Sequence, residues 1–210
     1  MVWLLCLGLV MGCAGQTSSE KPVAPPPEPK EVLAAQAQVA RLHAAMMEIM
    51  KAGPELGYAG RKALVMDLTL EIFDLPTMAR LTYGPGWASL DVEQRALWIE
   101  TYSRFQASST AEVRDRYRGQ VYRMLGYEVL PEDRVLIETQ LDYPGRAVDF
   151  YTNYLLRRTD QGWKIVDVFS PPSVSEVAMR RAEYQTVLEK SGFSGLVEDM
   201  ERRMKHRSHP

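Results

Sequence analysis

Residues 73–105, FDLPTMARLTYGPGWASLDVEQRALWIETYSRF, contain the order of local structures that decides the fold. An apolar–acidic turn precedes a short helix expected over 76–81, and a Gly-Pro-Gly break stops that helix. Asp91 and Gln94 then have the spacing of a capping box at the start of a long amphipathic helix. The stretch therefore predicts two helices joined by a tight turn.

The long helix has an aromatic apolar face. Trp98, Tyr102 and Phe105 recur at helical spacing, and the pattern continues to Tyr117. A continuous helix to that residue would be roughly 40 Å long. Weak helix formers at 108–110 favour a bend before its end.

The remaining elements follow from two apolar periods. Spacings of three and four predict a first helix over 31–51 and a second over 61–73. A period of two then predicts four strands with short connections. These strands are expected over 121–129, 135–141, 148–157 and from 163 onward. Two helical segments, 177–188 and 196–204, close the chain, and Gly192 stops the first of them. We predict an α+β fold, in which several helices pack on a four-stranded antiparallel sheet and enclose an apolar cavity.

The N-terminus has the pattern of an export signal. The apolar run over 2–11 is shorter than the about 20 residues that span a bilayer. Val10-Met11-Gly12-Cys13 resembles a bacterial lipobox, which predicts a signal peptide with lipobox over 1–13 and lipidation of Cys13. Two alternatives are a small-x-small cleavage site at Gly12-Cys13-Ala14 and a buried N-terminal helix.

A Pro-rich linker is expected over 14–30, reaching about 50 Å if extended. It precedes a folded domain over 31–205 and a basic tail over 206–210. Both cysteines, Cys6 and Cys13, precede the domain, so we expect no disulfide within it.

Composition and motifs favour binding over catalysis. The formal net charge of −2 does not suggest a nucleic-acid partner. No G-x-S-x-G, Gly-rich phosphate loop or H-E-x-x-H occurs, and the three histidines suggest no metal site. We expect no enzyme activity, metal or cofactor. Asp167, on a predicted strand, could be an acid in a pocket, but an ion pair with Arg or a cap on a turn is the commoner role.

The quoted stretch resembles the MlaC family, the toluene-tolerance auxiliary proteins of lipid ABC transporters. The resemblance is carried by Phe73-Asp74, Met78-Ala79-Arg80, Gly84-Pro85-Gly86-Trp87 and Gln94-Arg95. It extends over roughly 30–204, with further matches at 162–168 and at Ser175, Arg181 and Tyr184. The chain departs from the family at Ser170-Pro171-Pro172, where Glu-Gly is common, and at Met179-Arg180-Arg181, where Tyr-Arg is common.

The resemblance implies a periplasmic phospholipid carrier that acts between the outer and inner membranes, in the maintenance of outer-membrane lipid asymmetry. The partners it implies are a phospholipid ligand, an inner-membrane ABC transporter complex and an outer-membrane lipoprotein complex. A related branch is associated with hopanoid biosynthesis, so a hopanoid-related lipid remains an alternative cargo. If Cys13 is lipidated, the linker holds the domain at one membrane.

An apolar cavity holds an acyl chain without specific contacts, because each buried CH₂ contributes about 0.8 kcal/mol. The residues expected to bind lipid come from the sheet and the long helix: Val148, Phe150, Tyr154, Trp163, Ile165, Trp98, Tyr102 and Phe105. Periodicity does not distinguish a lined cavity from a filled core, so these residues could also close the domain. The alternatives are then an envelope lipoprotein scaffold, or a small-molecule enzyme in which Asp167, a tyrosine and His43 converge.

Overall fold

The computed structural model describes residues 30–112, 117–145, 150–170 and 173–208. The predicted signal peptide, Cys13, most of the linker and Val148 lie outside these ranges. The described helices are α1 (Lys30–Ala52), α2 (Gly57–Ile72), α3 (Leu75–Tyr83), α4 (Val92–Thr110) and α5 (Glu176–Ser208), with 3₁₀ turns at Gly53–Leu56 and Gly84–Ser89. None of the helices in this part of the chain is long and apolar enough to cross a membrane.

The strands form one antiparallel sheet in the order β1-β2-β3-β4-β5. They are β1 (Val121–Leu130), β2 (Arg134–Asp142), β3 (Phe150–Thr159), β4 (Gly162–Ser170) and β5 (Val174–Ser175). The predicted four-stranded meander is confirmed, and β5 adds two residues that pair with Phe169 and Ser170. Two residues are too short to show a period, so the sequence pattern gave no sign of β5.

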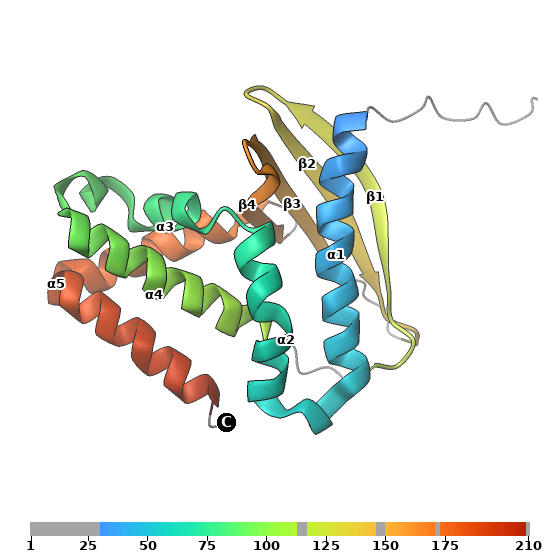
Figure 1. The fold of residues 1–210 in the computed structure, drawn as a ribbon, viewed down its shortest axis with the longest axis horizontal. Coiled ribbons are helices and arrows are strands. Elements are labelled where there is room, and N and C mark those ends of the chain that lie inside the picture. Colours follow the sequence, from blue (N-terminus) through green and yellow to red (C-terminus); the bar gives the residue numbers. More distant parts are fainter. Residues whose placement is uncertain (1–29, 113–116, 146–149, 171–172, 209–210) are drawn as a thin grey trace, which may run out of the picture.

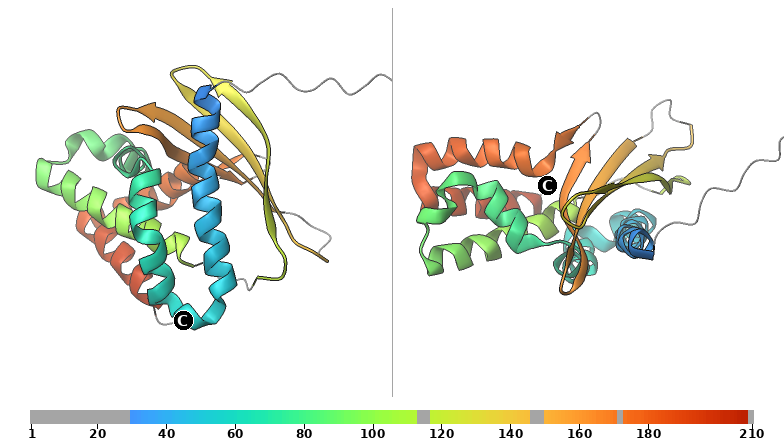
Figure 2. Two further views of the ribbon diagram at one scale, coloured as in Figure 1. Left: turned by 45° about the vertical axis from the view of Figure 1, so that its right-hand side comes forward. Right: turned by 90° about the horizontal axis from the view of Figure 1, so that it is seen from above.

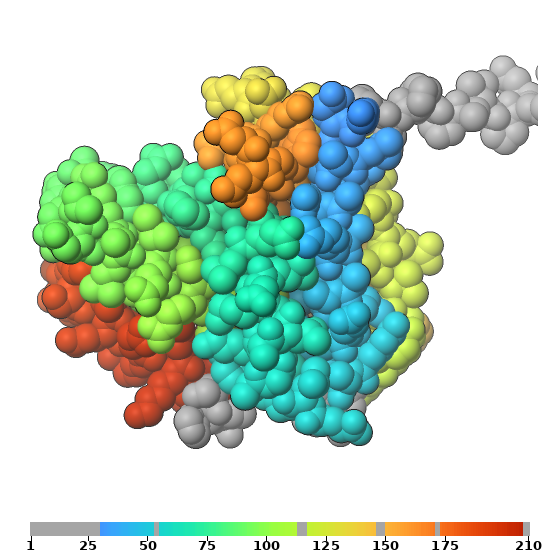
Figure 3. Space-filling model, viewed as in Figure 1, coloured from blue at the N-terminus to red at the C-terminus, as the bar shows by residue number. Residues whose placement is uncertain are grey.

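The helices fall into two groups (Figures 1 and 2). Helices α1 and α2 cover one face of the sheet, and α3, α4 and α5 pack together beyond its β4 end. In the space-filling view, α1 and α2 lie side by side in front of the sheet, and β1 emerges beside α1 (Figure 3). The α1 stripe is buried as predicted, including Val32, Val39 and Leu42, because its three-and-four spacing keeps those residues on one side of the helix.

Asp74 joins the two groups. Its backbone N–H donates to the Ile165 carbonyl of β4 at 2.8 Å, beside a bridge between Phe73 and Ile165. One carboxylate oxygen accepts the Thr77 N–H at 3.1 Å, which caps α3. The other accepts from the Arg157 guanidinium of β3 at 2.5 Å. A single residue thus fixes the start of α3 against two strands, through its side chain to β3 and through its backbone to β4.

The α3–α4 pair is held by a buried tryptophan. The indole N–H of Trp98 donates to the Ala79 carbonyl at 2.8 Å, and both residues are fully buried. The predicted capping box is confirmed, with Asp91 and Gln94 each accepting the other's backbone N–H. Helix α4 ends at Thr110, so it does not continue to Tyr117. The hydroxyl of Thr110 bonds back to the Gln106 carbonyl, as expected of the weak helix formers there.

Helix α5 consists of two limbs joined at Gly192, whose φ of 64° lies in the left-handed region that favours glycine. The sequence predicted this break between two helical segments. An ion pair between Arg203 of the second limb and Glu183 of the first ties the limbs together. Both limbs belong to the α3–α4–α5 group.

The Asp74 contacts predict a large loss of stability for Asp74→Ala. The substitution removes a helix cap and a charge-assisted hydrogen bond, so the free energy of unfolding should fall by about 2–3 kcal/mol. Asp91→Ala, which removes an exposed cap from α4, is the matched control and should cost about 1 kcal/mol. Urea unfolding measures both. Equal losses would contradict the role given to Arg157.

Candidate functional site

An apolar hollow of about 440 Å³ lies between α1 and β1. Its volume is within the range of about 300–1,000 Å³ that is typical of ligand pockets. It is open to the surface, where Ala40 and Ala44 of α1 are exposed on its rim. Its lining residues are Ala40, His43, Ala44, Met47, Tyr117, Gln120, Val121, Tyr122 and Met124.

His43 forms the inner wall of the hollow. Its imidazole stacks on the Tyr122 ring of β1, with centroids 3.9 Å apart and an interplanar angle of 11°. Its Nε2 is hydrogen-bonded to the Tyr154 hydroxyl of β3 at 3.3 Å. Tyr154 belongs to the main hydrophobic core, so the His43 ring stands between the hollow and that core.

The wall is uncharged. Burial lowers the pKa of His43 to about 4, so the imidazole is neutral near pH 7. Burial raises the pKa of Tyr122 to about 12 and raises the pKa of Tyr154 as well. Polar groups that stay neutral suit a site for an apolar ligand, because no ion has to be desolvated when the ligand binds.

The predicted residues of α4 lie in the α3–α4–α5 group. Trp98, Tyr102 and Phe105 are fully buried. The Trp98 ring packs edge-on against Tyr184 of α5 at 5.4 Å. The guanidinium carbons of Arg180 and Arg207 lie 5.1 and 4.3 Å from the centroid of the Phe105 ring. These contacts fill the space around the three side chains.

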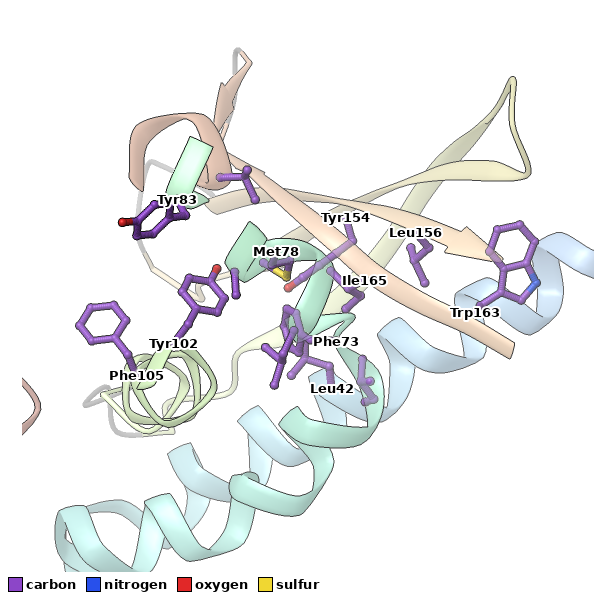
Figure 4. Close-up of a cluster of buried hydrophobic side chains, with 14 of the residues drawn as sticks. Leu42, Phe73, Met78, Tyr83, Tyr102, Phe105, Tyr154, Leu156, Trp163 and Ile165 are labelled. Carbon is purple, nitrogen blue, oxygen red and sulfur yellow. The ribbon is translucent and has the colours of Figure 1, made fainter. Parts of the chain in front are cut away.

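Three of the predicted residues of the sheet belong to the main hydrophobic core. Tyr154, Trp163 and Ile165 are buried in the same core as the α4 residues, and Figure 4 shows Trp163 and Phe105 at opposite ends of that cluster. Phe150 is 50% exposed. Val148 lies outside the described residues.

None of the described residues predicted to bind lipid is among those that line the hollow. Sequence reasoning missed the α1 and β1 residues because it looked for large apolar side chains. A signal was present in Ala40 and Ala44, which are four residues apart on one side of α1 and leave room beside the helix. Tyr154 connects the two sets, since it contacts His43.

A second hollow, of about 430 Å³, lies where α2 and α3 meet the β3–β4 turn. Charged and polar side chains line much of it, including Asp74, Arg157, Asp160 and Lys164. Arg157 is bonded to Asp74, and the Lys164 ammonium donates to the Glu71 carbonyl. This polar lining is unsuited to an acyl chain.

Asp167 has a structural role. Its carboxylate accepts the Val168 and Val177 N–H groups at 2.8 and 3.1 Å and the Ser175 hydroxyl at 2.5 Å. The Ser175 hydroxyl accepts the Ala178 N–H, so the pair caps the start of α5. The ring contacts and hydrogen bond of His43 are with Tyr122 and Tyr154, not Asp167. No group of three or more potential metal ligands occurs among the described residues.

Comparison with known proteins identifies the fold. The family model described as MlaC protein matches residues 40–202. A solved structure of a phospholipid-binding protein from Ralstonia solanacearum, in complex with a phospholipid, is similar at a TM-score of 0.64 and 19% identity. The alignment covers 83% of this chain and 98% of that one. Comparison with curated protein sequences gave no match.

The lowered pKa of His43 predicts an acid-dependent loss of stability. The unfolded imidazole has its ordinary pKa near 6.5, so between pH 6.5 and 4 the unfolded chain binds a proton that the folded chain does not. The free energy by which the neutral, buried His43 stabilises the folded state is therefore fully present above pH 6.5 and is lost as the pH falls toward 4. From pH 7.5 to 5 the loss should be about 2 kcal/mol. Urea unfolding at both pH values measures it.

His43→Phe keeps an aromatic ring but does not titrate. Between pH 7.5 and 5 the free energy of unfolding of this variant should therefore fall by about 2 kcal/mol less than that of the parent protein. Identical pH dependence in the two proteins would show that His43 is not buried in its neutral form.

Proposed function

Because the chain belongs to the MlaC family, we propose that it is a periplasmic phospholipid-binding carrier that moves lipid between the outer and inner membranes. In this proposal it works with an inner-membrane ABC transporter complex and an outer-membrane lipoprotein complex, the partners that the family resemblance implies. The phospholipid is its ligand, and carriage involves no covalent step.

The hollow between α1 and β1 is the observation that carries the proposal. Apolar side chains from both elements line it, and the His43 and Tyr122 side chains of its wall are neutral. Each CH₂ of an acyl chain buried there contributes about 0.8 kcal/mol. Because the hollow opens to the surface, a charged head group can stay in water while the tail is buried. The phospholipid bound to the Ralstonia protein of the same fold supports this choice of ligand.

The chemistry of the polar groups also favours a carrier over an enzyme. The Asp167 carboxylate is engaged by three donors at the start of α5. His43 is held between two tyrosines, and its lowered pKa leaves it a weak base. The proposal therefore assigns neither residue a role in bond making or breaking.

Native mass spectrometry tests ligand binding. The chain from residue 14 onward, which lacks the predicted signal peptide and Cys13, should carry the mass of one diacyl lipid when it is purified from bacteria without detergent. Ala44→Trp places a large ring at the rim of the hollow and should cut the lipid-bound fraction at least five-fold. Ala34→Trp is the matched control, because Ala34 is also exposed on α1 but does not line the hollow.

A bare polypeptide mass that stays unchanged after incubation with phospholipid vesicles would contradict the carrier proposal. It would favour an envelope lipoprotein scaffold, for which the filled core around Trp98 and Phe105 is the supporting observation. Equal lipid loading of the Ala44→Trp variant would place the ligand elsewhere in the domain.

We also propose that Cys13 is lipidated and tethers the domain to one membrane. Cells grown with radiolabelled palmitate should then yield a labelled mature protein, and Cys13→Ser should abolish the label. An unlabelled parent protein would instead favour a freely diffusing carrier.

A further inference from the structure

The His43 imidazole stands between the hollow and the Tyr154 hydroxyl, and two contacts hold its ring. His43 is only 5% exposed although it lines an open hollow, because Tyr122 covers one face of its ring. Behind it, Tyr154 pairs with Ile137 of β2 and Val168 of β4, which places it in the middle of the sheet. A ligand that passes from the hollow toward Tyr154 therefore meets this imidazole.

The hydrogen bond to Tyr154 holds the imidazole in place. The Tyr154 side chain is buried among apolar residues, so its hydroxyl would have to find another partner if His43 moved. Displacement of the ring thus costs one buried hydrogen bond and one aromatic stack, and the same contacts form again when the ring returns. Because the imidazole is neutral, the movement exposes no buried charge.

The surrounding elements allow the ring to move. Strand β1 is the edge strand of the sheet and is hydrogen-bonded to β2 alone among the described strands. Its ladder is interrupted by an irregularity between Met124 and Gly126, next to the hollow. An edge strand with such an interruption can shift relative to α1 without breaking a second ladder.

We propose that His43 is a latch, whose bond to Tyr154 keeps the hollow closed off from the helix–sheet interface until an acyl chain displaces the ring. This inference rests on the proposed function, because it assumes that the hollow takes up lipid. It makes His43 a positioning residue that sets the rate of lipid exchange.

Tyr154→Phe tests the latch, because it removes the hydroxyl and keeps the ring. The chain from residue 14 onward is mixed with phosphatidylethanolamine–phosphatidylglycerol vesicles that contain a self-quenched fluorescent phospholipid, and the rise in fluorescence gives the uptake rate. Loss of one net hydrogen bond should speed uptake by about five-fold. Tyr151→Phe, at an exposed tyrosine of the same strand, is the control and should leave the rate unchanged.

His43→Ala provides a second variant. It removes the latch itself, so uptake should be fast, and adding Tyr154→Phe to it should change the rate no further. If the two substitutions acted independently by destabilising the domain, their effects on the uptake rate would add. An unchanged rate in the double variant therefore indicates that His43 and Tyr154 act as one latch. Circular dichroism checks that each variant is folded.

Three results would overturn the latch. Uptake by Tyr154→Phe at the parent rate, while the parent protein takes up lipid, would reject the latch and leave the carrier proposal standing. Additive effects in the double variant would assign the change in rate to a general loosening of the domain. Failure of the parent protein to take up lipid would reject the carrier proposal, and the latch with it.

Discussion

The carboxylate of Asp74 is the contact on which the arrangement of the two helix groups depends. It caps α3, accepts the Arg157 guanidinium of β3, and belongs to a residue whose N–H bonds to β4. The start of α3 is therefore fixed at one end of the sheet, and α4 follows through the Trp98–Ala79 hydrogen bond. The Asp167 carboxylate of β4, together with Ser175, likewise fixes the start of α5 against the sheet. Both acidic side chains stabilise helix starts rather than a reaction.

This anchoring at β4 explains where the hollow lies. The α3–α4–α5 group packs beyond β4 and fills its own interior with aromatic side chains (Figure 4). At the opposite edge of the sheet, α1 packs beside β1, and its small side chains at Ala40 and Ala44 leave space next to that strand. One end of the fold is thus closed and braced by ion pairs, and the other is open and apolar. Both properties suit the proposed carrier, because the ion pairs stabilise one end of the fold and the hollow at the other end is accessible to a ligand.

The sequence predicted the order of elements because helices and strands leave different apolar periods, and Gly192 and the Asp91 capping box marked a break and a helix start. It did not predict the residues that line the hollow. Periodicity identifies a buried face but not whether its neighbours fill the adjoining space. Trp98, Tyr102 and Phe105 are on a buried face, as predicted, but Tyr184, Arg180 and Arg207 occupy the space beside them. Those contacts join residues about 75–100 positions apart, which no local pattern encodes.

The position of a bound acyl chain is the central claim, and photo-crosslinking measures it most directly. The protein would be loaded with a phospholipid that carries a diazirine near the end of one acyl chain, irradiated, and digested for mass spectrometry. The account predicts labels on residues that line the hollow, such as Met47, Tyr122 and Met124. Labels confined to Trp98, Tyr102 and Phe105 of α4 would contradict it, because the chain would then lie in the core that the structure shows filled.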